Sequence, residues 1–179
     1  MIEYLWSIHH LSYIKFIDTI KQGYKMIQTK LKTYFLEMNK HIELIIESLD
    51  VLTPLLPVQE YEELNQLQRF ALNALIFRFS KLQDLLGAKI FRTYLEYSGF
   101  NTQGISYFDI LREIEKEGIV DIDSWGELRE LRNKIAHDYP EELDEMIESI
   151  NLFIDRSAVL VHIAQKVEQN FYEIERKRD

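Results

Sequence analysis

The chain has 179 residues, of which 46% are hydrophobic and 28% charged, so it is long enough and apolar enough to fold around one core rather than remain disordered. Its six Gly and three Pro argue against a loop-rich or all-β fold, and the absence of Cys excludes disulfides, thiolate metal sites and Cys nucleophiles. The net charge of −9 argues against a general nucleic-acid or membrane coat, because either would need an overall positive field.

The first 57 residues predict two helices. Apolar residues recur at helical spacing over residues 2–20, and Gly23 is the predicted cap at the end of that helix. A second apolar seam runs over residues 24–52 with steps of three and four until Pro54 breaks it. Such a seam suits either an ordinary bundle helix or a coiled-coil contact with a second subunit.

No secretory or membrane segment is expected. The N-terminal stretch lacks a basic start and a small-residue cleavage site, and charged residues interrupt it. Nowhere do about 18 apolar residues follow one another without a charge. The sequence therefore predicts a cytoplasmic protein with no membrane contact.

The middle of the chain continues the helical pattern. Residues 59–97 predict one long helix or two collinear ones, with Gly87 as a possible kink and Gly99 as the stop. Residues 98–106 form a loop by composition, and a short helix follows over residues 107–116.

Two more helices complete the chain. One is predicted from Trp125 to about His137 with Asp123 or Ser124 as its cap, and the last begins at Pro140. No strand-like alternation is long enough to compete. The predicted fold class is therefore all-α, an up-and-down helical bundle of the four-helix type with an additional N-terminal helical segment.

The segment ELRELRNKIAHDYP, residues 127–140, carries the chemistry of interest. One side of its predicted helix is an apolar stripe, and another brings two guanidinium groups, an amide and an imidazole together. The residues on that polar side are Arg129, Arg132, Asn133 and His137.

This set of groups suits a phosphodiester of RNA. Arginine can hold a phosphate oxygen and stabilise transition-state charge, whereas histidine can move a proton. Cleavage needs a base for the ribose 2′-OH and an acid for the leaving 5′-oxygen, but one helix supplies a single His. Two copies across a two-fold axis would supply both, with no metal required.

The same spacing fits a purely structural arrangement equally well. Arg129 and Arg132 could pair with Glu127, Glu130 or neighbouring carboxylates, and His137 could simply close the helix end. Spacing alone leaves both interpretations open.

The segment RNKIAHDY, residues 132–139, resembles the R-N-x3-H-x-Y motif of the HEPN superfamily, specifically the HepT-type toxins encoded beside minimal nucleotidyltransferase antitoxins. Two upstream segments, FRFSKLQDLLGAKIF at 77–91 and WGELRELRN at 125–133, also resemble the larger HepT-like members. The resemblance covers residues 59–167. It implies a HEPN (HepT-like) domain over residues 58–179.

The resemblance implies a homodimer whose paired motifs line one cleft and act as a metal-independent endoribonuclease without a cofactor. Arg132 would orient the phosphate and His137 would transfer the proton. Asn133 would orient the His or the RNA, and we place Arg129 and Lys134 with it as substrate contacts. The implied partners are the RNA substrate and the cognate minimal nucleotidyltransferase.

Tyr139 matches the tyrosine that such antitoxins adenylylate. An attached AMP would bring a phosphate beside Arg132 and fill the cleft, which would silence the toxin of a type VII-like pair.

Residues 1–57 exceed the compact HepT core and are predicted to pack on the bundle or on the dimer interface. Two other functions remain open. The chain could be a non-catalytic subunit that binds a nucleotide or substrate for a minimal nucleotidyltransferase, or a plain helical interaction protein whose contact surface is the seam over residues 24–52.

Overall fold

The structure, a computed structural model, describes residues 2–53, 57–59, 61–137 and 143–178. Side chains are described for these residues except 2–14, 16, 61, 136–137 and 143–146. The elements in chain order are α1 (Ile2–Leu52), η2 (Tyr61–Glu63), α2 (Gln66–Leu85), η3 (Leu86–Ile90), α3 (Phe91–Ser98), α4 (Tyr107–Lys116), α5 (Ile122–His137) and α6 (Leu143–Arg178).

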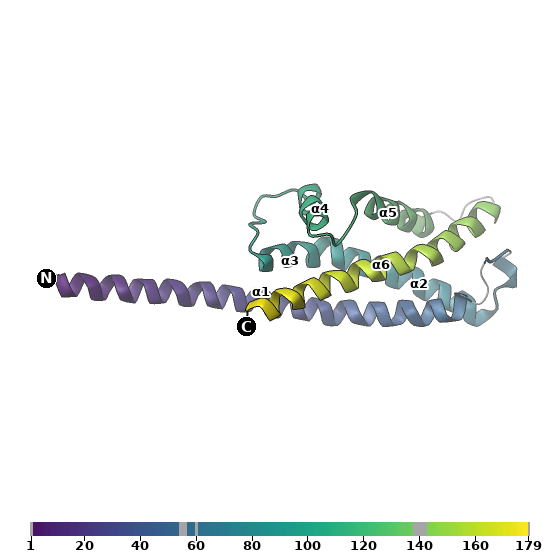
Figure 1. Cartoon of the computed structure of the whole chain (residues 1–179). Coiled ribbons are helices and arrows are strands. Elements are labelled where there is room, and N and C mark those ends of the chain that lie inside the picture. Colours follow the sequence, from purple (N-terminus) through teal and green to yellow (C-terminus); the bar gives the residue numbers. More distant parts are fainter. Residues whose placement is uncertain (1, 54–56, 60, 138–142, 179) are drawn as a thin grey trace.

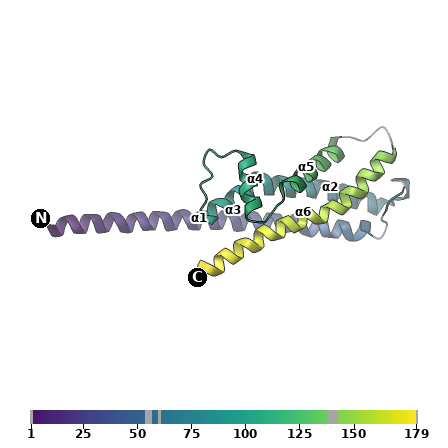
Figure 2. The same ribbon diagram turned by 45° about the horizontal axis from the view of Figure 1, so that its top comes forward.

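The helices alternate in direction, as the up-and-down prediction requires. Helix α1 runs along the bundle, α2 and α3 return beside it, α5 runs back again and α6 returns to the C-terminus (Figure 1). Contacts join α1, α2 and α6 pairwise, and α5 packs on α2, α4 and α6. The N-terminal part of α1 extends alone beyond the bundle (Figure 2). An all-α bundle is therefore confirmed.

Helix α1 is continuous, so the prediction of two helices divided at Gly23 is wrong. A β-carbon at this position would meet nothing within 4 Å. The helix passes through because its backbone hydrogen bonds do not need a side chain there, and one glycine costs only about 1 kcal/mol. Farther along, the seam turns inward and forms one wall of the core, with Leu31, Phe35, Met38, Ile42, Ile45 and Leu52 buried.

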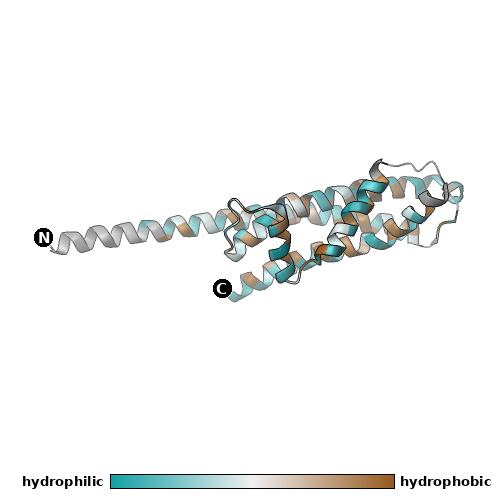
Figure 3. Cartoon of the chain, turned by 90° about the horizontal axis from the view of Figure 1, so that it is seen from above, coloured by the Kyte–Doolittle hydropathy of each residue, from teal (hydrophilic) through white to brown (hydrophobic). Residues whose placement is uncertain are grey.

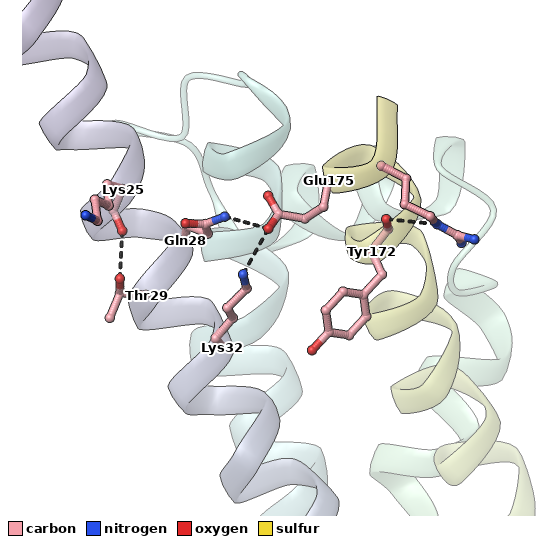
Figure 4. A network of polar contacts seen from close by, with 7 residues as sticks. Lys25, Gln28, Thr29, Lys32, Tyr172 and Glu175 are labelled. Atoms are coloured by element: carbon pink, nitrogen blue, oxygen red, sulfur yellow. Dashed lines mark hydrogen bonds and ion pairs between the residues drawn. The ribbon is translucent and has the colours of Figure 1, made fainter. Parts of the chain in front are cut away.

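The two long helices are also tied together by polar contacts (Figure 4). The Glu175 carboxylate of α6 accepts a hydrogen bond from Gln28 Nε2 at 2.5 Å and pairs with Lys32 Nζ at 2.9 Å. Nearby, the Arg178 guanidinium stacks 4.4 Å from the centre of the Tyr24 ring. These contacts fix the C-terminal end of α6 against α1 at the point where α1 leaves the bundle.

The rod formed by α2 and α3 contains a π-helical segment, η3, around Gly87. A β-carbon on Gly87 would lie 2.8 Å from the Tyr107 hydroxyl oxygen of α4, so only glycine allows this close approach. The predicted kink is thus a change of helix type within a continuous rod. The rod begins at an Asn65 capping box and ends at Gly99, whose φ of 97° is the predicted left-handed stop.

Helix α4 has the bounds predicted for it, and its cap is Ser106. Helix α5 starts three residues before the predicted Trp125, because its N-terminal amide at Ser124 donates to the Asp121 carboxylate at 2.8 Å. Asp121 is thus the cap, in place of Asp123 or Ser124. These hydrogen bonds hold the pKa of Asp121 below its usual value. The predicted start at Pro140 lies outside the described residues.

Hydrophobic and hydrophilic residues alternate along every helix of the bundle (Figure 3), and the apolar ones converge on one contiguous core. Within the described residues, no helix is both long enough and apolar enough to span a membrane.

Candidate functional site

Packing of the apolar stripe sets the rotation of α5. Trp125 is 1% exposed and packs edge-on against Phe91 of α3, and Leu128 and Leu131 are also buried. Ile135 is partly buried against the same core. The opposite side of α5 therefore faces solvent, and Arg129, Asn133 and Lys134 are exposed there.

Arg132 lies at the boundary between the core and the solvent. Its Nη2 is 3.4 Å from Asp84 Oδ2 of α2, and its Nη1 donates to Asn133 Oδ1 at 3.1 Å. Among the described residues its Nε has no hydrogen-bond partner, although it is buried. The edge formed by Nε and Nη2 is one that can hold two oxygens of a phosphate or carboxylate at once. Here that edge makes only one long contact.

The structural interpretation allowed a neighbouring carboxylate as the partner of Arg132, and Asp84 is such a partner. This carboxylate belongs to α2 rather than to Glu127 or Glu130. Glu127 instead approaches Arg156 of α6, with Oε2 3.7 Å from Nη2. Because the Arg132–Asp84 pair is 30% and 58% exposed, it contributes little to stability.

Arg129 turns away from Arg132. Its guanidinium carbon lies 5.6 Å from the centre of the Tyr107 ring of α4, within the range of a cation–π contact. The structure therefore brings Arg132 and Asn133 together and directs Arg129 toward α4.

The remaining predicted residues lie at the end of the helix. His137 is the last residue of α5, but its side chain is outside the described part of the chain. Tyr139 lies outside the described residues altogether. Among the residues that are described, no three acidic or histidine side chains come close enough to hold a metal ion.

Two residues of the site were missed by sequence reasoning. Asp84 contacts Arg132 from 48 positions away in the sequence, and Gln83 beside it lines a pocket against Trp125 and Tyr107. No local pattern marks Gln83. Asp84 is the one acidic residue between Arg69 and Arg92, a stretch whose other charges are basic, and this was the signal that the sequence offered.

The chain is an all-α bundle. The polar side of α5, one of its packed helices, carries two arginines near the C-terminal end of that helix. Comparison with known families matches residues 39–176 to the HEPN_Cthe2314-like HEPN family, which is well over half of the chain. The chain belongs to that family, within the HEPN superfamily, so the resemblance to HEPN seen in the sequence is confirmed at the level of the superfamily. Neither the curated proteins nor the solved structures contain a match.

HEPN domains are in general of the ribonuclease type, so membership indicates a nuclease or RNA-binding function of that general kind. The matched region begins within α1, before the division predicted at residue 57. That division of the chain into an extension and a HEPN domain stays a prediction.

Proposed function

We propose that the chain is the toxin of a type VII-like HEPN/nucleotidyltransferase pair, a metal-independent endoribonuclease that works as a homodimer. Arg132 binds the scissile phosphate and His137 transfers the proton. Asn133 orients His137 or the RNA, with Arg129 and Lys134 as further contacts to the phosphate backbone.

The reaction needs two proton transfers and no redox step. A neutral His137 takes the proton of the ribose 2′-OH, and the 2′-oxygen attacks the adjacent phosphorus. The bond from phosphorus to the 5′-oxygen breaks, and a protonated His137 of the second copy gives that oxygen its proton. The products are a 2′,3′-cyclic phosphate and a free 5′-hydroxyl, while Arg132 stabilises the charge gained by the phosphate oxygens.

The state of Arg132 is the observation that supports this proposal most directly. Arg132 is positioned by Asp84 and Asn133, yet its Nε has no partner among the described residues, and α5 ends five residues later at His137. A guanidinium that is oriented but incompletely hydrogen-bonded can accept a phosphate without first being released from a strong ion pair.

An exposed stripe on the α2 rod supports the homodimer. It follows steps of three and four at positions 67, 70, 74, 77, 81, 84 and 88, all of them exposed. Leu67, Phe70 and Phe77 are each more than half exposed, which is unusual for residues of this size in one row. The stripe passes through Asp84, the residue that contacts Arg132, so a second copy packed along it would lie beside the Arg132 region.

The proposed control acts at Tyr139. A nucleotidyltransferase antitoxin that transfers AMP to its hydroxyl would place a phosphate two residues from His137 and compete with RNA for the same cations. The antitoxin is thus proposed to act as an enzyme on this chain.

The test is a gel assay of purified protein on total RNA with EDTA present, using wild type, Arg132→Ala and His137→Ala. Arg112→Ala is the matched control, because Arg112 is an exposed arginine on α4 whose carboxylate contact is at 3.7 Å. We expect fragments with 2′,3′-cyclic ends from wild type and from Arg112→Ala only. If wild-type protein whose mass shows that Tyr139 is unmodified leaves the RNA intact, the ribonuclease proposal is overturned.

A second function is favoured by the pocket that Gln83, Trp125 and Tyr107 line beside Asp84. In this case the chain is a non-catalytic subunit that holds a nucleotide or substrate for a minimal nucleotidyltransferase. The two functions differ in cells. A ribonuclease toxin stops growth when expressed alone and loses that effect with His137→Ala, whereas a binding subunit has no toxicity to lose.

A further inference from the structure

The pocket lies where the rod of α2 and η3 meets α4 and α5. Its volume is about 270 Å³, a little below the roughly 300–1,000 Å³ typical of small-molecule sites. It is lined by Gly87 and Ala88 of η3, by Tyr107 of α4 and by Trp125 of α5, and the Tyr107 hydroxyl and the indole edge both approach Gly87 closely. A space of this size with aromatic walls suits one planar ring system.

The aromatic walls are held in position by a hydrogen bond. Trp125 Nε1 donates to the Tyr107 hydroxyl at 2.9 Å, and the Arg129 guanidinium carbon lies 5.6 Å from the centre of the Tyr107 ring. The hydroxyl thus accepts one hydrogen bond and keeps its own proton to donate, because it has no acceptor elsewhere among the described residues. The pocket therefore presents a fixed donor beside a ring.

Gln83 supplies the second polar group, and its state points to a ligand. The residue is 5% exposed, it lines the pocket, and its amide nitrogen has no hydrogen-bond partner within the described part of the chain. A buried amide without a partner is costly and rare in a folded core. Rotation about its terminal torsion would turn either the oxygen or the nitrogen toward the pocket.

Asp84 connects the pocket to the phosphate site. Its carboxylate lines the pocket and also meets Arg132 Nη2 at 3.4 Å. On α5, Arg129 and Arg132 are three residues apart, a rise of about 4.5 Å. A nucleotide unit whose phosphate is at Arg132 would therefore have its base within reach of the pocket.

We propose that this pocket is a base-recognition subsite, in which the Tyr107 ring packs against one base of the RNA and Gln83 reads its hydrogen-bonding edge. The proposal rests on the proposed function for its substrate class and deepens it. Base recognition by an amide and a stacked or edge-on ring is chemically suited to unpaired RNA, whose base edges are free.

Mononucleotide binding tests the subsite without relying on cleavage. The full chain carrying Trp6→Phe leaves Trp125 as the sole indole, since the sequence has two Trp. The probes are the four nucleoside 5′-monophosphates, with ribose 5-phosphate as the probe that keeps the phosphate and lacks the base. We expect at least one nucleotide to bind about tenfold tighter than ribose 5-phosphate and to change the Trp125 fluorescence.

Two variants separate the base from the phosphate. Gln83→Met keeps side-chain length and removes the amide, and it should lower the affinity for the preferred nucleotide to that for ribose 5-phosphate. Arg132→Ala should weaken all five probes together. Gln66→Met is the matched control, because Gln66 is exposed at the start of the same helix, and it should change nothing.

The subsite is overturned if ribose 5-phosphate binds as tightly as every nucleotide, or if Gln83→Met keeps the base preference. A circular-dichroism melt checks that Gln83→Met is folded. We expect it to fold, because the amide nitrogen that the substitution removes has no hydrogen-bond partner within the described part of the chain. These outcomes are separate from failure of the ribonuclease. If RNA stays intact in the gel assay, the ribonuclease proposal fails, but base-selective binding can still hold. If RNA is cleaved and no base preference is found, the subsite fails and the ribonuclease proposal holds.

Discussion

Arg132 of α5 and Asp84 of α2 form an ion pair across the bundle, with Nη2 3.4 Å from Oδ2. The two residues are 48 positions apart, and their contact directs the guanidinium of the R-N-x3-H motif along the α2 rod. A carboxylate at this place orients the arginine and also competes with any phosphate that approaches it.

Asp84→Asn should therefore tighten RNA binding without unfolding the chain. Removing one exposed carboxylate beside Arg132 removes repulsion toward RNA phosphates, and the lost pair is worth at most about 1 kcal/mol of stability. The measurement is anisotropy of a labelled short RNA at several salt concentrations in a His137→Ala background. Asp155→Asn on the exposed side of α6 makes the same charge change away from the site, and an equal gain from it would refute the local effect.

Phe77→Glu should convert the proposed homodimer to a monomer and abolish RNA cleavage while the helical content stays unchanged. A charge placed beside the exposed apolar residues Leu67 and Phe70 of the stripe would have to be desolvated on association. Light scattering after gel filtration gives the mass, and the gel assay gives the activity. Phe108→Glu on α4 is the control because Phe108 is similarly exposed and lies off the stripe, so the dimer should survive it. A wild-type chain that is already monomeric would count against the composite cleft.

Gly87→Ala should destabilise the fold by about 1–3 kcal/mol, because the added methyl group would meet the Tyr107 hydroxyl at 2.8 Å. Urea unfolding followed by circular dichroism measures the change.

Gly126→Ala is the opposite case on α5, since a β-carbon there meets nothing within 4 Å. It should stabilise the chain by about 0.4–1 kcal/mol through lower backbone entropy in the unfolded state. Equal effects of the two substitutions would contradict the close approach at η3.

His41 should make the stability depend on pH. Burial, followed by the nearby positive charge of Arg78, lowers its pKa below the usual 6.5, and its Nδ1 has no partner among the described residues. The unfolded chain therefore binds more protons below about pH 6.5. The free energy of unfolding should fall as the pH drops through that value, by at most about 1.4 kcal/mol per pH unit.

Melting curves between about pH 7.5 and 5.5 measure this dependence. His41→Leu should flatten the curve in this range, and His162→Gln, which changes an exposed histidine of α6, should leave it as in wild type. A curve of unchanged slope in His41→Leu would assign the dependence to other groups.

Features that depend on neighbours a few residues away could be predicted from the sequence. The bounds of α4, the stop at Gly99 and the buried stripe of α5 all follow from caps and apolar spacing, because a helix is closed and turned by its own backbone and side chains. The same local motif carried the HEPN resemblance, which the family match confirmed.

Which distant residues meet became visible only in the folded chain. The close approach of Tyr107 to Gly87 and the placement of Asp84 and Gln83 against α5 depend on how the helices of the bundle pack. These contacts leave no periodic mark in the sequence, since each joins side chains whose spacing is set by the crossing of two helices rather than by the turn of one.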